Sequence, residues 1–205
     1  MTYEEILSFL DGMPATAEER MAYVHARISQ VFGWIAFPDK FWLCEFLPDL
    51  RKEFDHRMHI LEIGTFNGGS SRGLIALTGG SLSGIDNWVD VADGAQAFWE
   101  TLRYPPDLSA HVKNLISDNS REVGQHWNEP IDLLFIDAAH SYDDAISDMR
   151  LFCPHVTQGG YCLVDDMEMG DVRQAVGEYF YNGEWEIIRE PDISTTAKIF
   201  CARRK

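Results

Sequence analysis

The pattern of hydrophobic and polar positions changes near residue 59. Before it, hydrophobic side chains recur at helical spacing, first around Phe9 and then over residues 15–32, where a glycine follows. A third helical stretch, over residues 38–48, has a proline at each end, and we expect the second of them to end it. We therefore expect residues 1–58 to form an N-terminal helical layer on the same domain as the rest of the chain.

From residue 59 onward, strand-like and helical segments alternate. Short apolar runs typical of strands cover residues 59–64, 81–87, 111–117, 131–137, 159–166, 185–190 and 197–203. Helical segments separate the first six runs, which predicts an α/β fold with a doubly wound, mostly parallel sheet. Only a short loop separates the last two, so we expect them to pair as an antiparallel hairpin at one edge. Residues 59–205 thus form the main part of the domain.

Composition narrows the class of protein. The chain has 205 residues, of which 45% are hydrophobic and 24% charged, as in an ordinary single globular domain. Its formal net charge of −16 disfavours nucleic acid and anionic membranes as partners. No apolar run approaches the ~20 residues that span a bilayer, and the N-terminus has no pattern of a secretion signal. The four cysteines form no C-x-x-C pair, so we expect free thiols and a cytoplasmic protein.

The predicted strand ends carry the chemistry. In open α/β sheets, ligands bind beyond the carboxyl ends of the strands, and here each of the first five ends in an acid or a glycine loop. The loop after the first strand reads E-x-G-x-x-x-G-G over residues 62–69. Phe66 breaks the dinucleotide pattern G-x-G-x-x-G, and no Gly-Lys-Ser/Thr follows, so neither phosphate-binding loop is present. Glu62 would repel a phosphate but attract a cation or an ammonium group.

Asp86 adds a second feature to this loop. It lies 22 positions after Gly64, close to the spacing of ~20 expected for an acid that bonds ribose hydroxyls. A nucleoside with a positive charge fits both features, and S-adenosylmethionine (SAM) is such a molecule. The alternative is that Gly64 and Gly68 are turn glycines without a ligand.

Several segments resemble a known family. LEIGTFNGGSS (61–71), GIDNW (84–88), SDN (117–119), DLLFIDAAHSY (132–142) and GGYCLVDD (159–166) look like the motifs of class I SAM-dependent methyltransferases. The last two are most similar to the metal-dependent O-methyltransferases of the macrocin and cephalosporin-tailoring type. The resemblance covers about Met58–Lys205 and implies a seven-stranded sheet of order 3-2-1-4-5-7-6 with the last strand antiparallel. It also implies a homo-oligomer, assembled through the N-terminal helices.

The resemblance assigns a cofactor site. Glu62 and the glycine loop would hold the amino-acid end of SAM, Asp86 the ribose, and Trp88 would lie near the adenine. Asp118 and Asn119 would meet the adenine edge. The complete set of expected SAM contacts is Glu62, Gly64, Thr65, Asn67, Gly68, Gly69, Ser71, Asp86, Asn87, Trp88, Asp118, Asn119 and Asp137.

Three carboxylates at two adjacent strand ends suggest a metal. Asp137, Asp165 and Asp166 offer the oxygen ligands that Mg²⁺ prefers, and the resemblance assigns the metal to the same positions. His140, three residues after Asp137, is the expected general base for a hydroxyl acceptor. We expect these residues to catalyse O-methylation of a small molecule such as a sugar, a natural-product scaffold or a catechol, with Asp137 also catalytic.

Three other functions stay open from the sequence. A metal-independent methyltransferase acting on nitrogen or a carboxyl group would keep Glu62 and Asp86 but not need the Asp165-Asp166 pair. A nicotinamide-dependent dehydrogenase is disfavoured by the missing G-x-G-x-x-G pattern. A non-catalytic protein that keeps the fold is disfavoured by the complete set of His140 and the three aspartates.

Overall fold

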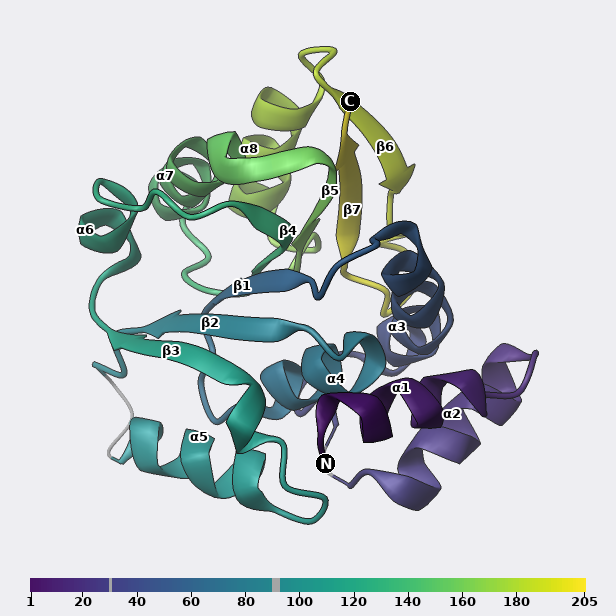
Figure 1. Cartoon of the computed structure of the whole chain (residues 1–205). Coiled ribbons are helices and arrows are strands. Elements are labelled where there is room, and N and C mark those ends of the chain that lie inside the picture. Colours follow the sequence, from purple (N-terminus) through teal and green to yellow (C-terminus); the bar gives the residue numbers. More distant parts are fainter. Residues whose placement is uncertain (30, 90–92) are drawn as a thin grey trace.

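The computed structural model describes residues 1–29, 31–89 and 93–205. Its centre is a seven-stranded sheet of order β3-β2-β1-β4-β5-β7-β6, as the resemblance implied (Figure 1). The strands are β1 (His59–Ile63), β2 (Ser81–Asp86), β3 (Val112–Ser117), β4 (Ile131–Ile136), β5 (Val156–Val164), β6 (Trp185–Arg189) and β7 (Phe200–Arg204). The first five are parallel, and β7 runs antiparallel between β5 and β6, which confirms the predicted hairpin.

Successive side chains of the central strands point to opposite faces, and each face is covered by helices. Ile60 and Leu133 pack against the N-terminal helices, α4 (Gly69–Thr78) and α5 (Gly94–Arg103). Leu61 and Leu134 pack on the other face, against α7 (Tyr142–Phe152) and α8 (Gly170–Phe180). The short helix α6 (Ser120–Gly124) lies beside α7. Burial on both faces explains why these strands read as nearly continuous apolar runs.

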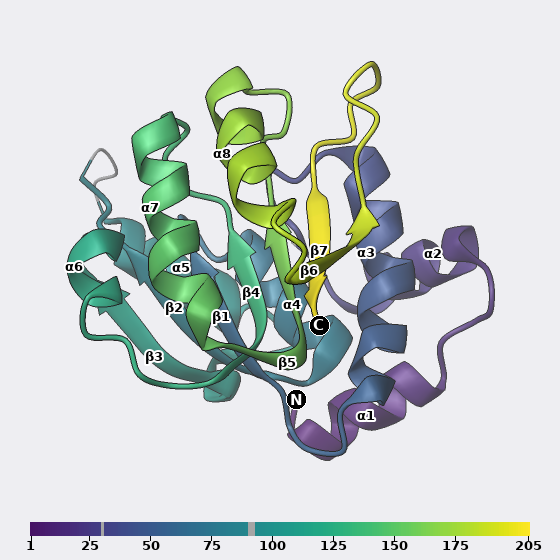
Figure 2. The ribbon, with the colours of Figure 1, turned by 90° about the horizontal axis from the view of Figure 1, so that it is seen from above.

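The N-terminal layer contains α1 (Tyr3–Asp11), α2 (Ala17–Arg27) and α3 (Phe37–Leu50), which Figure 2 shows grouped away from α6 and α7. The prediction that the second helix reaches Phe32 is wrong. Ile28 is extended, and Phe32 takes a left-handed φ of 63° while its N–H donates to Gly69 O at 2.7 Å. This segment therefore leaves the helix to meet the glycine loop.

The prediction that the third helix ends at Pro48 is also wrong, because α3 continues to Leu50. A proline in the last turn removes one helical hydrogen bond, and its fixed φ suits the helix. Leu47 and Leu50, on either side of Pro48, are fully buried, so packing holds the turn.

The carboxyl ends of the strands are joined by backbone hydrogen bonds. Gly64 N donates to Ile85 O, and Asp137 N donates to Ile63 O, both at 2.9 Å. Asp165 N donates to Ile136 O at 3.0 Å. The residues that follow β1, β2, β4 and β5 therefore form one continuous rim, hereafter the carboxyl rim.

Two further predictions concern the cysteines and the length of the apolar segments. All four cysteines are free thiols, as predicted, and all four are buried. Among the described residues, no helix has the length and apolar character that crossing a membrane requires.

Candidate active site

The glycine loop after β1 is shaped by close backbone contacts. Gly64 has a φ of +87°, and a Cβ there would lie 1.8 Å from the carbonyl oxygen of Asp137. Only glycine lets the loop after β1 approach the loop after β4 this closely. Phe66 also takes a positive φ, of 44°, a conformation that is strained for a bulky residue and is found most often at functional sites.

Asp86, at the end of β2, holds this loop. One carboxylate oxygen accepts from Phe66 N at 2.7 Å, and the other accepts from Trp88 N at 2.8 Å. The Trp88 indole turns back and donates to Phe66 O at 2.8 Å. Asp86 is thus fixed at the rim, and Trp88 supports the loop.

A cavity of about 520 Å³, hereafter the rim cavity, lies beside Asp86. It is lined by Ile63, Gly64, Phe66, Ile85, Asp86, Asn87, Val89, Asp118, Asn119, Ser120, Asp137, Ala138, Ala139, Asp144 and Asp148. Its size is in the range of small-molecule sites. The cavity gathers the predicted ribose contact, Asp86, and the predicted adenine contacts Asp118 and Asn119 from the ends of β2 and β3.

A second cavity of about 320 Å³, hereafter the histidine cavity, adjoins the first. It is lined by Phe32, Gly33, Trp34, Ile35, Gly64, Thr65, Phe66, Asn67, Ser70, Asp137, Ala138 and His140. Gly64, Phe66, Asp137 and Ala138 line both cavities. A molecule bound in the rim cavity can therefore contact a second molecule bound near His140, because the two cavities meet at these shared residues.

Glu62 lies beneath the loop with an unused oxygen. It is fully buried and accepts a short hydrogen bond from Ser71 Oγ, while Oε1 has no partner. The Thr65 hydroxyl is also buried without a partner. Burial raises the pKa of Glu62 to about 7, and the charge of Asp86 adds to this. An ammonium group would supply the missing donor and counter-charge, so these residues fit the amino-acid end of SAM.

The three predicted metal ligands follow two neighbouring strands, β4 and β5, on the carboxyl rim. Burial raises the pKa of Asp137 well above its usual range, and the charges of Asp165 and Asp166 add to the effect. Burial likewise raises the pKa of Asp165, beside Asp166. Two cationic or ionisable groups approach Asp166: His140 Nε2 lies 2.7 Å from Oδ2, and Lys198 Nζ lies 3.5 Å from Oδ1.

The type of side chain, and not a complete set of ligands, is what suits these residues to a metal. Crowded carboxylates that disfavour each other's charge suit a hard divalent cation. Across residues 1–29, 31–89 and 93–205, however, no three His, Cys, Asp or Glu side chains converge as a ligand set.

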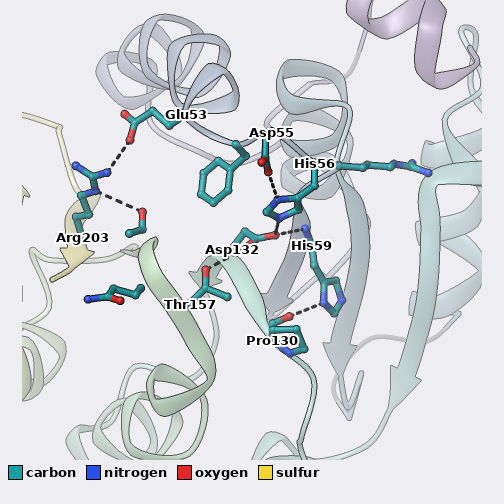
Figure 3. Close-up of a pocket in the computed structure, with 12 residues that line it drawn as sticks. Glu53, Asp55, His56, His59, Pro130, Asp132, Thr157 and Arg203 are labelled. Carbon is teal, nitrogen blue, oxygen red and sulfur yellow. Dashed lines mark hydrogen bonds and ion pairs between the residues drawn. The ribbon is translucent and has the colours of Figure 1, made fainter.

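A further cavity, of about 600 Å³, lies at the opposite edge of the sheet and is called the amino-edge cavity (Figure 3). Figure 3 shows His56 and Thr157 directed toward Asp132. The hydrogen bonds that join each of them to Asp132 are both 3.0 Å long. Asp132 also accepts from His59 N at 2.8 Å and is buried. Its carboxylate is thus occupied by contacts that join the starts of β1, β4 and β5.

The structure gathers most of the predicted residues, but not all of them line a cavity. Gly64, Thr65, Asn67, Asp86, Asn87, Asp118, Asn119, Asp137 and His140 line the rim or histidine cavity. Glu62, Gly68, Gly69, Ser71, Trp88, Asp165 and Asp166 are not among the residues that line them.

The residues that line these cavities include two contributors that the sequence pattern did not indicate. One is the segment 32–35, whose approach to the loop depends on a long-range contact without a local signal. The other is Asp148, which is buried on α7, accepts from Ser120 Oγ at 2.7 Å and lines the rim cavity. Burial raises the pKa of Asp148 to about 6. The sequence pattern places Asp143, Asp144 and Asp148 together on the polar side of this helix, and the burial of Asp148 shows that this prediction is wrong for Asp148.

Comparison with known proteins identifies the family of the chain. A family model described as a methyltransferase domain matches residues 61–167, just over half of the chain. An uncharacterized protein of Acanthamoeba polyphaga mimivirus is 30% identical over 112 residues, covering 53% of this chain and 51% of that protein. The chain thus matches about half the length of this curated relative.

Two solved structures share the fold. A TDP-rhamnose 3′-O-methyltransferase of calicheamicin biosynthesis, solved in its apo form, is similar with a TM-score of 0.63 and 16% identity, covering 98% of this chain and 92% of that one. A protein of Streptococcus mutans, solved in complex with S-adenosylhomocysteine (SAH), is similar with a TM-score of 0.61 and 13% identity, covering 83% and 99%.

Proposed function

The chain belongs to the methyltransferase domain family and is a SAM-dependent methyltransferase, and from this we propose that it methylates a hydroxyl group of a small molecule. The observation that carries the proposal is the His140–Asp166 pair, in a cavity that adjoins the rim cavity at Gly64 and Asp137. A histidine oriented by a carboxylate suits the removal of a proton from an alcohol. The similar fold of a sugar O-methyltransferase supports the same class of acceptor.

We assign the two ends of SAM to the two parts of the rim. The Glu62 carboxylate and the Thr65 hydroxyl, both buried with an unused oxygen, would bind the amino-acid end together with Asn67 and the backbone of Gly68 and Gly69. Ser71 orients Glu62 through its hydrogen bond.

The rim cavity would hold the nucleoside. Asp86, already fixed by two backbone N–H groups, would accept the ribose hydroxyls beside Asn87. Asp118 and Asn119 would meet the adenine, and Trp88 would support the loop from behind. SAM supplies a methyl carbon made electrophilic by the neighbouring sulfonium, so the protein has to position a deprotonated oxygen in line with it.

His140 is the proposed general base. Its side chain is half exposed in the histidine cavity, and Asp166 fixes Nε2 at 2.7 Å, which leaves Nδ1 to take the acceptor proton. Asp137 lines both cavities and would face the reacting groups.

Asp137, Asp165 and Asp166 are the residues that would hold a divalent cation such as Mg²⁺. When bound, the cation would lower the pKa of the acceptor hydroxyl and orient it. The mutual repulsion of these carboxylates supports this assignment.

A metal-independent methyltransferase is the second candidate, and one observation favours it. The Lys198 ammonium contacts both Asp166 and Glu168, so a cation of the protein itself already balances part of the acidic rim. Such an enzyme would use His140 and Lys198 without a metal.

The test is calorimetric titration of SAM into the purified protein, followed by an activity screen with hydroxylated sugars and catechols. We expect SAM to bind at micromolar concentration and methylated product to form from a hydroxyl acceptor. Absence of SAM binding would contradict the cofactor assignment. Repeating the turnover assay with Mg²⁺ and with EDTA separates the two candidates, because activity that survives EDTA favours the metal-independent enzyme.

A further inference from the structure

The segment 31–40 forms a wall of the active site, although it lies in the N-terminal layer. Phe32 N donates to Gly69 O at 2.7 Å, and a Cβ at Gly69 would lie 2.7 Å from the Gly33 Cα. The segment is therefore fastened to the glycine loop by backbone contacts. It contributes four residues, Phe32, Gly33, Trp34 and Ile35, to the histidine cavity.

Trp34 is the most exposed large hydrophobic side chain of the described residues. Its relative exposure is 86%, and its single aromatic neighbour, Phe66, meets it edge-on at 6.5 Å. Leaving an indole in water forgoes the burial of a large apolar surface, so an exposed indole beside a reactive histidine is typical of a ligand platform. The face of the ring is free to stack against a ring of the acceptor.

Another cavity at this end of the sheet, of about 500 Å³ and hereafter the outer cavity, is also lined by Trp34. It shares Gly33, Trp34 and Asn67 with the histidine cavity, and it is further lined by His25, Val31, Lys40, Gly69 and Thr101. An acceptor longer than one ring can therefore extend past Trp34 from one cavity into the other.

The outer cavity has the opposite charge character from the carboxyl rim. Its lining includes Lys40 and His25 but no carboxylate among the residues that the structure describes. Lys40 Nζ donates to Gly33 O at 3.0 Å, and no Asp or Glu of the described chain lies within 4 Å of it. In a chain of net charge −16, an ammonium without an acidic partner beside a cavity is an anion-binding feature.

We infer that Trp34 and Lys40, both in the segment 31–40, recognise the acceptor, and that this acceptor carries a ring that stacks on Trp34 and an anionic group, a carboxylate or a phosphate, that binds Lys40. This inference rests on the proposed function. The hydroxyl would lie near His140, and the anionic group would lie in the outer cavity, away from Asp137, Asp165 and Asp166.

The test compares acceptor-like probes that differ by one anionic group. Catechol and 3,4-dihydroxybenzoate form one pair, and glucose and glucose 1-phosphate form the other. Each is titrated calorimetrically into the protein saturated with SAH. We expect the anionic member of at least one pair to bind at least tenfold more tightly, and this preference to disappear in Lys40→Gln.

Matched variants provide the controls. Lys52→Gln removes an exposed lysine that pairs with Asp49, so it should keep the preference. Trp34→Ala should weaken the binding of the preferred probe at least tenfold, Trp34→Phe should restore part of it, and Phe37→Ala should leave it unchanged, because Phe37 is exposed but lines none of the three cavities at this end of the sheet.

Equal binding within both pairs, or no binding of any probe, would overturn the inference, as would a preference that survives Lys40→Gln. A change of oligomeric state in Trp34→Ala without a change in probe binding would assign Trp34 to a protein contact instead. SAM binding is measured in every variant. If the unmodified protein does not bind SAM, the proposed function is refuted. If it binds SAM but does not prefer the anionic probe of either pair, only this inference is refuted.

Discussion

His140 Nε2 lies 2.7 Å from Asp166 Oδ2, so the loop after β4 and the end of β5 meet at one ionisable pair. Asp166 holds this position in a left-handed conformation with a φ of 61°, which is strained for a residue other than glycine. Such a conformation at Asp166 indicates that the position of its carboxylate matters for function. The pair therefore combines a group able to take a proton with a group that fixes its orientation.

Replacing His140 with alanine should separate catalysis from cofactor binding. We expect the kcat to fall by roughly 10²–10⁴-fold, because a positioned base contributes about that much, while the Kd for SAM changes less than twofold. Asp166→Asn should lower the kcat less, since the histidine remains. Steady-state kinetics and calorimetry of each variant give the two values. His126→Ala, an exposed histidine outside the cavities, serves as the control. Activity above a tenth of the original in His140→Ala would exclude the assigned role.

The buried carboxylate of Glu62 should lower the stability of the folded protein while it strengthens the binding of SAM. Burial raises its pKa in the folded protein to about 7, from 4.5 for an ordinary glutamate, and the charges of Asp86 and Asp137 lie nearby. The folded state therefore keeps a proton that the unfolded chain releases, and the free energy of unfolding falls as the pH rises from about 4.5 to about 7.

Glu62→Gln should remove this dependence. At pH 8 we expect the ligand-free variant to gain at most roughly 3 kcal/mol of stability, and at pH 4 to gain none. The same change should weaken SAM binding, because the ammonium loses its carboxylate. Thermal unfolding between pH 4 and pH 8, with and without SAM, measures both effects. A stability difference that does not vary with pH would contradict the assigned protonation.

How much of the site follows from the sequence depends on the range of the contacts involved. Asp86 and Asp137 could be predicted because Asp86 ends β2 and Asp137 directly follows β4, and the ends of parallel strands share one edge. Asp39 could not be: it is fully buried, and it binds Arg189 Nη1 at 2.6 Å and Lys198 N at 2.8 Å, more than 140 residues away.

The same limit applies to Trp34 and Lys198. A local pattern predicts which face of an element is apolar, but the approach of Trp34 to Phe66 or of Lys198 to Asp166 depends on how distant elements pack. The fold class and the carboxyl rim were therefore predictable from the pattern, and the strand order from the family resemblance, whereas the contacts of Trp34 and Lys198 were not.

Asp86→Ala should abolish tight SAM binding by two routes. The carboxylate is the proposed ribose acceptor, and it also holds the N–H groups of Phe66 and Trp88. Hydrogen bonds to a charged group contribute about 1.5–3 kcal/mol each, so we expect the Kd to rise at least 100-fold. The Kd of Asp86→Asn, which keeps one acceptor oxygen, should lie between those of the original protein and Asp86→Ala. Asp11 is an exposed acid on α1, so Asp11→Ala should bind SAM as the original protein does. Unchanged affinity in Asp86→Ala would move the nucleoside elsewhere.

Asp132, at the opposite edge of the sheet, should prove structural. Replacement by alanine leaves the N–H of His59 and the hydroxyl of Thr157 without their acceptor, and each such loss costs about 1–3 kcal/mol when the group is buried. We expect a lower unfolding temperature and an unchanged Kd for SAM at temperatures where the variant is folded. Asp132→Asn should lose less.

The loss in Asp132→Ala should also depend on pH. Hydrogen bonds that the His56 ring donates to Asp132 and, with a smaller effect, to Asp55 raise the pKa of His56 above 6.5 in the folded protein. The stability that this pair adds is therefore fully present below pH 6.5 and disappears as the pH rises through the folded pKa. The difference between the original protein and Asp132→Ala should accordingly narrow from pH 6 to pH 9 in thermal unfolding. A variant of full stability that fails to bind SAM would instead assign the amino-edge cavity a part in cofactor binding.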